Sequence, residues 1–368
     1  MNYVKSVKVD GFKSFRSTAV ELGKVNVLIG ANGAGKSNFL AVFHMISFMM
    51  AEELQTFVGS RGRASSLLHY GPKRTPRMSI ELRFQTDTGE STYACSLAHA
   101  APDSLIFVNE EAIFNRAGGT SPRQVQMGAG HWESAIFDRA KTEKVARVIQ
   151  HLLQSCKVFQ FHDTSPTSPL RSARYVDDNR YLRTDGGNLA AFLLRLRETR
   201  KEYYDRIVAT VRQIAPFFRD FVLDTTKENR REIFLNWRDM DPEGVFGPHL
   251  LSDGTLRAMA LITLLLQPED VMPKVILIDE PELGLHPYAI EVLASLMKTA
   301  AEHAQIIAAT QSTKLVDQFE TGDIVVADRS GSETRLSRPD PSALREWIEE
   351  YSVGDLWEKN VLGGRPSA

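Results

Sequence analysis

The chain has 368 residues but only two cysteines, Cys95 and Cys156, so it offers neither a disulfide framework nor a Cys/His metal cluster. Its longest apolar run, near Phe39–Met50, is shorter than the ~20 residues that cross a bilayer. The first fifteen residues are too charged and too regularly alternating for a signal peptide. These features predict a cytoplasmic protein with no membrane segment.

Neither sign of charge dominates, because 44 Lys and Arg face 46 Asp and Glu for a net charge of −2. This balance argues against a nucleic-acid binder that is basic throughout, but it leaves room for a local basic patch. The sequence also lacks a sustained heptad repeat, an internal repeat and a low-complexity segment. With 43% hydrophobic and 24% charged residues, it has the composition of an ordinary globular protein.

A phosphate-binding loop is the most informative stretch. An apolar run beginning at Val25 predicts a buried strand, Gly30 to Ser37 matches GxxxxGK[ST], and Asn38–Met50 predicts a helix. Glycines allow successive N–H groups to face one anion, which the helix N-terminus also attracts. Lys36 is expected to reach the β- and γ-phosphates and Ser37 to ligate Mg²⁺. The expected nucleotide-binding residues here are Gly30, Ala31, Asn32, Gly33, Ala34, Gly35, Lys36, Ser37 and Asn38.

Two later stretches carry further candidate site residues. Lys274-Val-Ile-Leu-Ile-Asp279-Glu280 predicts a buried parallel strand that ends in two carboxylates, at the edge of a sheet where ligands bind. Leu250-Leu-Ser252-Asp-Gly254-Thr-Leu-Arg opens an apolar helix that runs to Gln267. Its N-terminus can bind an anion, or Ser252 can be a simple helix cap.

The remaining pattern predicts mostly strands in the first third of the chain. Met78–Gln85 and Glu90–Ala98 predict a hairpin, and Leu105–Val108 with Glu111–Arg116 predict another strand pair. Asn188–Phe217 predicts helical structure that is amphipathic and rich in arginine, with Pro216 near its end. The stretch from Ser60 to Arg77 contains glycines and prolines and predicts a loop. It contains five basic residues and no acidic one, so it is either a surface for nucleic-acid phosphates or a solvated connector: Arg61, Arg63, Lys73, Arg74 and Arg77.

The order of phosphate loop, LSDGT and VILIDEP resembles ABC-type P-loop ATPases of the RecF/SMC-like branch. It is most similar to short, stand-alone predicted AAA family ATPases that share LSDGTLR, DEPELGLHP and TQS. The resemblance implies an α/β fold and a single ABC-ATPase head over residues 1–368. Lobe I, with a mixed β-sheet core, would cover 1–160 and 271–336. The helical signature lobe would cover 161–270, a C-terminal extension 337–368, and no coiled-coil arm is expected.

The same resemblance implies roles for single residues. Asp279 would hold Mg²⁺ and Glu280 would orient the attacking water. Ser252 and Gly254 would face the γ-phosphate bound by a partner subunit, so ATP would close a homodimer. Gln311 stands where the wider family has a histidine; glutamine can hydrogen-bond a phosphate but cannot titrate near neutral pH, which predicts slow hydrolysis.

Two further positions keep open alternatives. Gln160 best matches the glutamine that contacts nucleotide and Mg²⁺, but its place between Phe159 and Phe161 equally fits a strand. His286 stands in the segment that, in the family, crosses the dimer interface (the D-loop). It equally fits a histidine at a helix start. The signature itself departs from the usual LSGGQ at Asp253 and Thr255.

The resemblance therefore favours an ATPase that uses ATP and Mg²⁺ and couples its ATP state to DNA or to a separate effector protein. Relatives of this type suggest phage defence or DNA repair. The sequence shows no second catalytic constellation. One alternative is an ATP-gated scaffold with negligible turnover, and a less favoured one is a transporter ATPase subunit.

The C-terminal segment is aromatic beyond the last strand that an ATPase core needs. It carries Trp347, Tyr351, Leu356 and Trp357, followed by Gly363-Gly364-Arg365-Pro366. These aromatic residues either cover the edge of the sheet or form a docking site for a partner protein.

Overall fold

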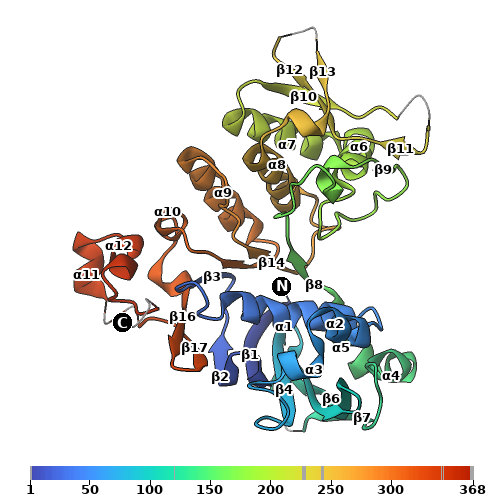
Figure 1. Ribbon diagram of the computed structural model, residues 1–368, viewed down its shortest axis with the longest axis vertical. Coiled ribbons are helices and arrows are strands. Elements are labelled where there is room, and N and C mark those ends of the chain that lie inside the picture. Colours follow the sequence, from blue (N-terminus) through green and yellow to red (C-terminus); the bar gives the residue numbers. More distant parts are fainter. Residues whose placement is uncertain are drawn as a thin grey trace. The chain divides into compact units, whose positions relative to one another are not determined.

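The computed structural model describes residues 2–119, 121–225, 229–241, 244–340, 342 and 344–364. The chain divides into two compact units. Unit 1 comprises residues 1–157, 273–277 and 304–368, and unit 2 comprises residues 158–272 and 278–303. Figure 1 shows the elements of both units, with β1 to β7 in unit 1 and α6 to α9 in unit 2.

An antiparallel sheet fills one side of unit 1. Its six strands lie in the order β2-β1-β4-β5-β6-β7. Their alternating pattern of buried and exposed residues buries one face, as period-two side chains require. The strands are β1 (Tyr3–Phe12), β2 (Phe15–Glu21), β4 (Arg77–Thr86), β5 (Gly89–Ala100), β6 (Ser104–Arg116) and β7 (Arg123–Gly128).

A second, mixed sheet has the order β17-β16-β3-β15-β14-β8. β3 pairs in parallel with both β15 and β16, whereas β17 is antiparallel to β16. Every residue of β15 is buried, as in a parallel strand covered on both faces. The strands are β3 (Val25–Ile29), β8 (Cys156–Phe159), β14 (Val275–Asp279), β15 (Gln305–Ala309), β16 (Ile324–Ser330) and β17 (Glu333–Ser337).

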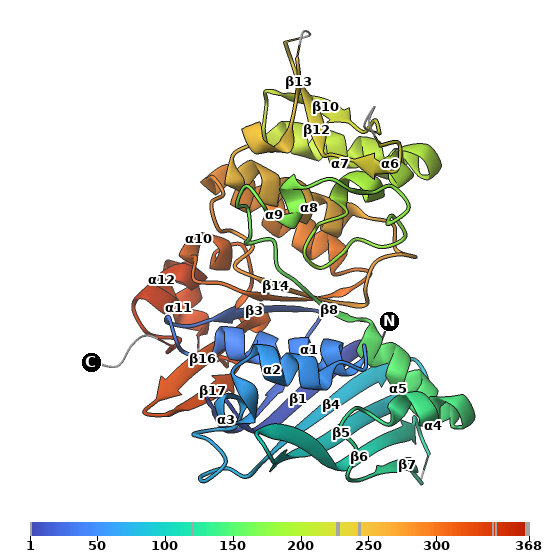
Figure 2. The same cartoon turned by 45° about the vertical axis from the view of Figure 1, so that its right-hand side comes forward.

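Helix α1 (Lys36–Met49) lies between the two sheets of unit 1, as Figures 1 and 2 both show. More than half of its residues are buried, which is why the sequence is apolar almost all round the helix. The other helices of unit 1 are α2 (Leu54–Ser60), α3 (Arg63–Leu67), α4 (Ile136–Thr142), α5 (Lys144–Gln154), α10 (Thr313–Val316), α11 (Arg345–Glu350) and α12 (Val353–Glu358), with a 3-10 turn at Thr321–Asp323.

Unit 2 is mainly helical. Its helices are α6 (Leu189–Thr199), α7 (Lys201–Ile214), α8 (Asp253–Leu266) and α9 (Pro287–Ala300). A three-stranded sheet of β10 (Phe218–Val222), β12 (Asn236–Asp239) and β13 (Val245–Phe246) accompanies them. Two short strands, β9 (Arg174–Tyr175) and β11 (Glu232–Ile233), also pair, and 3-10 turns lie at Pro169–Arg171 and Pro248–Leu250.

Two local predictions, for Ser60–Arg77 and for Leu105–Arg116, are wrong, and the helical prediction for Asn188–Phe217 is confirmed with a break. The stretch Ser60–Arg77 is not a continuous loop, because α3 lies inside it. Asn188–Phe217 forms two helices, α6 and α7, separated at Arg200, whose φ of −147° is not helical. Leu105–Val108 and Glu111–Arg116 belong to the single strand β6.

β6 contains Glu110, a fully buried carboxylate that lies between the two predicted strands. Its carboxylate accepts hydrogen bonds from the hydroxyls of Tyr93 and Ser134 and from the backbone N–H of Ala135, and it contacts the His131 ring. Burial next to this carboxylate raises the pKa of Tyr93, so its hydroxyl stays a donor. The strand continues because every oxygen of Glu110 has a partner.

Candidate nucleotide-binding site

The phosphate loop in unit 1 requires glycine at two positions. Gly30 has φ +151° and Gly35 has φ +113°, values that other residues rarely adopt. A Cβ at Gly30 would lie 2.3 Å from the Ala327 carbonyl oxygen, and one at Gly35 would lie 2.4 Å from Thr334 Oγ1. Both contacts are far too short, so only glycine lets the loop pack against β16 and β17.

Helix α1 begins directly after the loop, and its first turn has no side-chain cap. Gly35 stands at the N-cap and contributes no acceptor, and the first turn has no acidic residue. Uncapped N–H groups at a helix start form a site for an anion. Lys36 lies over the same loop, nearly buried, with Nζ 2.5 Å from the Gly30 oxygen and 3.1 Å from the Ala31 oxygen. The loop thus gathers an ammonium group and uncapped N–H donors.

The polar side chains of the loop differ in how they are engaged. Asn38 Nδ2 donates to Ser14 Oγ at 2.8 Å, which ties α1 to the turn between β1 and β2. Ser37 and Asn32 are exposed, and neither side chain has a hydrogen bond within the described residues. The Ser37 hydroxyl is therefore available to a hard cation such as Mg²⁺, which prefers oxygen ligands.

Gln311 follows β15 at the edge of the sheet where the phosphate loop follows β3. The two strands are parallel, with Ala309 opposite Leu28, and the Thr310 N–H donates to the Leu28 oxygen at 2.9 Å. Gln311 itself is exposed, and Ser312 caps α10. Unit 1 therefore brings Gln311 to the same sheet edge as Gly30.

Two residues outside the sequence motifs support the loop from β16 and β17. Thr334 Oγ1 donates to the Ala34 oxygen at 2.8 Å, and Arg329 donates to the Gly33 oxygen at 3.1 Å. Both lie about 300 positions from the loop, at separations of 300 and 296 residues. No local motif could have linked them to it.

The C-terminal segment also reaches the phosphate loop. Leu356 and Trp357 in α12 are buried, and the Gly354 N–H donates to Asp317 Oδ1 at 2.7 Å. Farther on, the Gly364 oxygen accepts the Ala31 N–H at 2.8 Å. These contacts favour the packing alternative for Leu356 and Trp357, whereas Trp347 remains 44% exposed. Arg365 and Pro366 lie outside the described residues.

We expect Gly364→Val to weaken ATP binding at the loop. Gly364 has φ +79°, and a Cβ there would lie 2.8 Å from Val326 Cγ1 and 3.4 Å from Gly30 Cα. Left-handed strain costs about 1–2 kcal/mol, and loss of the bond to Ala31 adds about 1 kcal/mol. Gly331→Val is the matched control, since Gly331 has φ +61° with open space around it. Equal ATP affinity of the two variants, measured by calorimetry, would show that the tail does not position the loop.

In unit 2, the signature stretch begins a helix and packs on the DEPELGLHP segment. Ser252 is the N-cap of α8 and accepts the Thr255 N–H at 3.2 Å, so the simple capping role exists. A Cβ at Gly254 would lie 2.1 Å from the Gly284 oxygen. Only glycine allows this approach, so unit 2 brings Ser252 and Gly254 beside the segment that follows Glu280.

Arg257 ties three segments of unit 2 together and was not selected from the sequence. Its guanidinium donates to the oxygens of Phe161 at 3.2 Å, His162 at 2.8 Å and Leu283 at 3.2 Å. A planar fork with five donors suits such a three-way bridge. It links the signature helix to the residues after Gln160 and to the residues after Glu280.

The two predicted acidic residues lie where β14 ends. Asp279 is the last residue of the strand. Its backbone carbonyl oxygen lies 2.8 Å from His162 Nε2. Glu280 has φ +42°, a backbone conformation that is unusual for a residue with a side chain. Such a conformation persists only where the surrounding structure holds it in place. Gln160 follows the end of β8, is exposed, and donates its N–H to the Thr184 oxygen.

Asp253 and His286 have local partners within unit 2. Arg171 lies 2.8 Å from Asp253, and this hydrogen bond lowers the pKa of that carboxyl. His286 is the N-cap of α9 and its Nδ1 accepts the Tyr288 N–H at 3.3 Å. The helix-start alternative for His286 is thus realised.

Comparison with known proteins assigns most of the chain to a family. Residues 25–317 match the protein family described as an AAA domain, putative AbiEii toxin, type IV toxin–antitoxin system. The chain belongs to this AAA-domain family. The matched residues include the phosphate loop, helix α8 and strand β14 of this AAA-domain chain.

Sequence relatives of the AAA-domain chain are similar over short stretches. Structural maintenance of chromosomes protein 3 of Arabidopsis thaliana is 40% identical over 137 residues, 31% of this chain and 11% of that protein. Urease accessory protein 2 of Cryptococcus neoformans var. grubii is 35% identical over 92 residues, 24% of this chain and 7% of that protein. The chain thus spans a small part of these relatives.

Solved structures show the fold. The SMC head bound to the C-winged helix domain of ScpA has a TM-score of 0.62 at 14% identity, over 93% of this chain and 99% of that one. The SMC head with an extended coiled coil, bound to the C-terminal domain of ScpA from Pyrococcus furiosus, has a TM-score of 0.56 at 14% identity, over 95% and 99%. The predicted α/β ABC-type head is therefore confirmed.

No coiled-coil arm is evident in the described part of the chain, where no helix is longer than 14 residues. For the same reason, none of the described helices could cross a bilayer.

Proposed function

We propose that this SMC-like P-loop ATPase hydrolyses ATP between two copies of the chain. The conclusion rests on the phosphate loop, where glycines at φ +151° and +113° lead into an uncapped helix start with Lys36 lying over it. The energetic logic is that of phosphoryl transfer, in which preorganised donors and cations stabilise charge on the transferred group.

Each proposed residue has one task. Lys36 and the N–H groups of the loop hold the β- and γ-phosphates. Ser37, Asp279 and Gln160 would supply oxygen ligands for Mg²⁺, which would neutralise charge on the phosphates. Glu280 orients and deprotonates the water, and Gln311 hydrogen-bonds the γ-phosphate. Ser252 and Gly254 complete the site of the partner copy from the start of α8.

ATP would then act as a switch on a two-state interface, closing the dimer until it is hydrolysed. The proposed readout is control of a separate effector protein or of DNA, in phage defence or DNA repair. The SMC heads solved with ScpA domains support a separate protein partner. Sedimentation tests the dimer: Mg²⁺-ATP should convert monomers to dimers and ADP should not. A chain that sediments identically with both nucleotides would contradict the proposal.

A scaffold with negligible turnover is the second candidate. Gln311 favours it, because glutamine cannot take a proton as histidine does. Glu280 argues against it, since a carboxylate held at φ +42° after the acidic strand has little use in a protein that only binds ATP.

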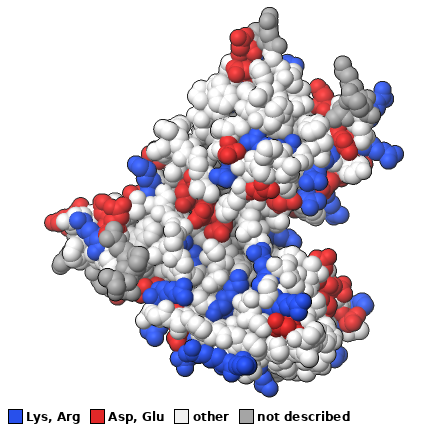
Figure 3. All heavy atoms as spheres, in the orientation of Figure 1, with Lys and Arg blue, Asp and Glu red and all other residues white. Residues whose placement is uncertain are grey.

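A basic surface on unit 1 supports DNA as one of the molecules handled. Its five residues are exposed, and none has an ion pair within the described residues: Arg61, Arg63, Lys73, Arg74 and Arg77. Figure 3 shows Lys and Arg gathered over the lower part of the face in view. Burial lowers the pKa of the nearby Lys13, and the positive charge of Arg61 lowers it further. Unpaired cations at this density suit a phosphate backbone.

We expect a triple substitution of Arg63, Lys73 and Arg77 to Gln to reduce the dependence of DNA affinity on salt. Each phosphate contact releases counterions, so the slope of log affinity against log salt should fall by about one per lost cation. Fluorescence anisotropy with double-stranded DNA measures it. A control triple variant at Arg116, Arg123 and Lys144, also exposed, should keep the slope. The same slope in both variants would make the surface a solvated connector.

A further inference from the structure

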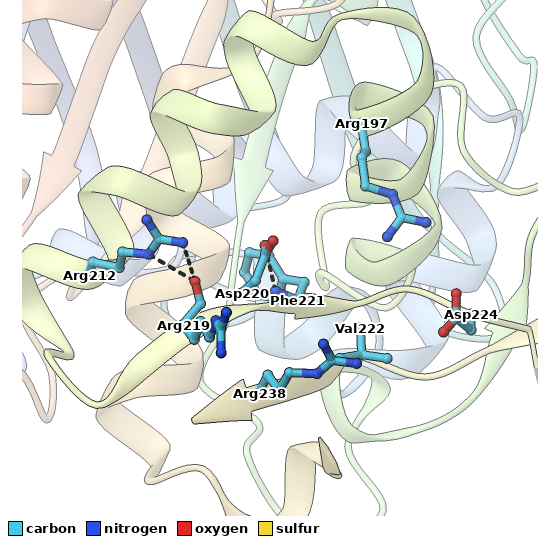
Figure 4. Close-up of a pocket in the computed structure, with 8 residues that line it drawn as sticks. All are labelled: Arg197, Arg212, Arg219, Asp220, Phe221, Val222, Asp224 and Arg238. Carbon is cyan, nitrogen blue, oxygen red and sulfur yellow. Dashed lines mark hydrogen bonds between the residues drawn. The ribbon is translucent and has the colours of Figure 1, made fainter. Parts of the chain in front are cut away.

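Four arginines of unit 2 line one cavity between α6, the end of α7 and the strands β10 and β12. The cavity has a volume of about 340 Å³, and its charged lining residues are Arg197, Arg212, Arg219, Arg238, Asp220 and Asp224. Figure 4 shows Arg219 and Arg238 reaching from neighbouring strands toward the same space, with Arg197 extending from α6 and Asp224 at the edge.

These guanidinium groups have no carboxylate partner within the described part of the chain, where no ion pair involves any of them. Arg212 donates to the Arg219 backbone oxygen and Arg197 to the Leu223 oxygen at 3.3 Å, which orients both side chains. Arg219 and Arg238 are exposed, and their side chains make no hydrogen bond with described residues.

The aspartates do not balance this charge. Asp220 is turned to the helix side, where Oδ1 accepts the Tyr204 hydroxyl at 2.7 Å and the Phe221 N–H at 2.8 Å. Burial and this carboxylate raise the pKa of Tyr204, so the phenol remains a donor. Four cations against two carboxylates leave a formal charge of +2 in one concave site.

Like charges held together with too few counterions repel one another, and a bound anion relieves that repulsion. Guanidinium groups recognise phosphate best, because their fork of N–H donors matches the tetrahedral oxygens. The volume is within the range of small-ligand pockets, about 300–1,000 Å³, so a phosphate and part of the group that carries it fit.

We propose that this cavity is a second anion site that binds a phosphate group, separate in sequence from the phosphate loop. The phosphate can belong to a free phosphorylated small molecule or to a nucleic-acid backbone. Both sources present the same oxygens to Arg219 and Arg238, so the two are distinguished by experiment.

The test uses the full chain with Lys36→Ala, so that the phosphate loop does not capture the probe. Sodium pyrophosphate is titrated by calorimetry, and a fluorescein-labelled single-stranded DNA by anisotropy. Arg219→Gln with Arg238→Gln should weaken binding of at least one probe by about tenfold or more, the loss expected for removing two charge-assisted pairs. Arg238→Lys keeps the charge but loses the fork, so an intermediate loss is expected.

Arg206→Gln is the matched control, because Arg206 is an exposed arginine of α7 that does not line the cavity. The Lys36→Ala chain that also carries Arg206→Gln should bind both probes within about twofold of the affinity of Lys36→Ala alone, as for the loss of an exposed surface charge. Loss of pyrophosphate binding alone identifies a free phosphorylated ligand, and loss of DNA binding identifies the backbone. If neither probe binds, or if the double variant and Arg206→Gln bind equally, the cavity is not a phosphate site. Unchanged melting temperatures exclude misfolding.

Discussion

Glu280→Gln should hydrolyse ATP at least about a hundredfold more slowly than the parent chain while still binding it. Removing a general base costs about 10²–10⁴ in rate, whereas binding depends on the loop and Lys36, which the substitution leaves intact. Glutamine has nearly the same shape, so the strained backbone at φ +42° does not need to change. Phosphate release under saturating Mg²⁺-ATP and calorimetric binding measure the two effects separately.

Glu291→Gln is the matched control, since it removes one exposed carboxylate from α9, farther along the same segment. Its turnover should equal that of the parent. If Glu280→Gln also hydrolyses ATP at the parental rate, Glu280 is not the general base.

Ser252→Arg should abolish both hydrolysis and ATP-dependent dimerisation, because it places bulk where the partner's γ-phosphate is expected. Ser252 also caps α8, so some loss of stability is inevitable. That loss is about 1 kcal/mol, typical of a removed helix cap, and is far too small to unfold the chain. The melting temperature and ATP affinity should therefore be nearly preserved.

Mixing experiments separate an action in trans from one in cis. Ser252→Arg keeps its phosphate loop, and Lys36→Ala keeps its signature helix. In a symmetric dimer with shared sites, a mixed dimer contains one site in which both elements are intact. Neither variant is expected to form ATP-bound homodimers, so the dimers in an equimolar mixture should be mixed ones with one intact site of two. Hydrolysis should then recover to at most about half of the parental rate. No recovery, with both variants folded, would place the signature in the site of its own subunit.

Local motifs carried most of what the sequence could predict. The strand ending at Ile29, the glycine loop and the helix from Lys36 are adjacent in sequence, so one stretch specifies all three. The acidic strand Val275–Asp279 and the helix capped by Ser252 were predicted for the same reason. The head fold is confirmed, whereas the roles of the site residues and the lobe boundaries at 160 and 270 stay predictions.

Contacts between segments that are distant in the chain could not be predicted from the sequence. Thr334 and Gly364 support the phosphate loop, and Arg257 bridges three segments through backbone oxygens, which leave no pattern in the sequence. The continuity of β6 also depends on such contacts, because the buried carboxylate of Glu110 is satisfied by groups from separate segments, among them Tyr93 and Ala135. The arginine cavity likewise forms only when α6, α7, β10 and β12 come together.

The most direct test of the central claim is steady-state phosphate release from Mg²⁺-ATP by the purified chain, compared with Lys36→Ala. Lys36 supplies the cation at the loop and lies within 2.5 Å of the Gly30 oxygen. We expect the parent chain to release phosphate and Lys36→Ala neither to bind ATP nor to release phosphate. Equal release by both proteins, or no ATP binding by the parent chain, would contradict an ATPase built on this loop.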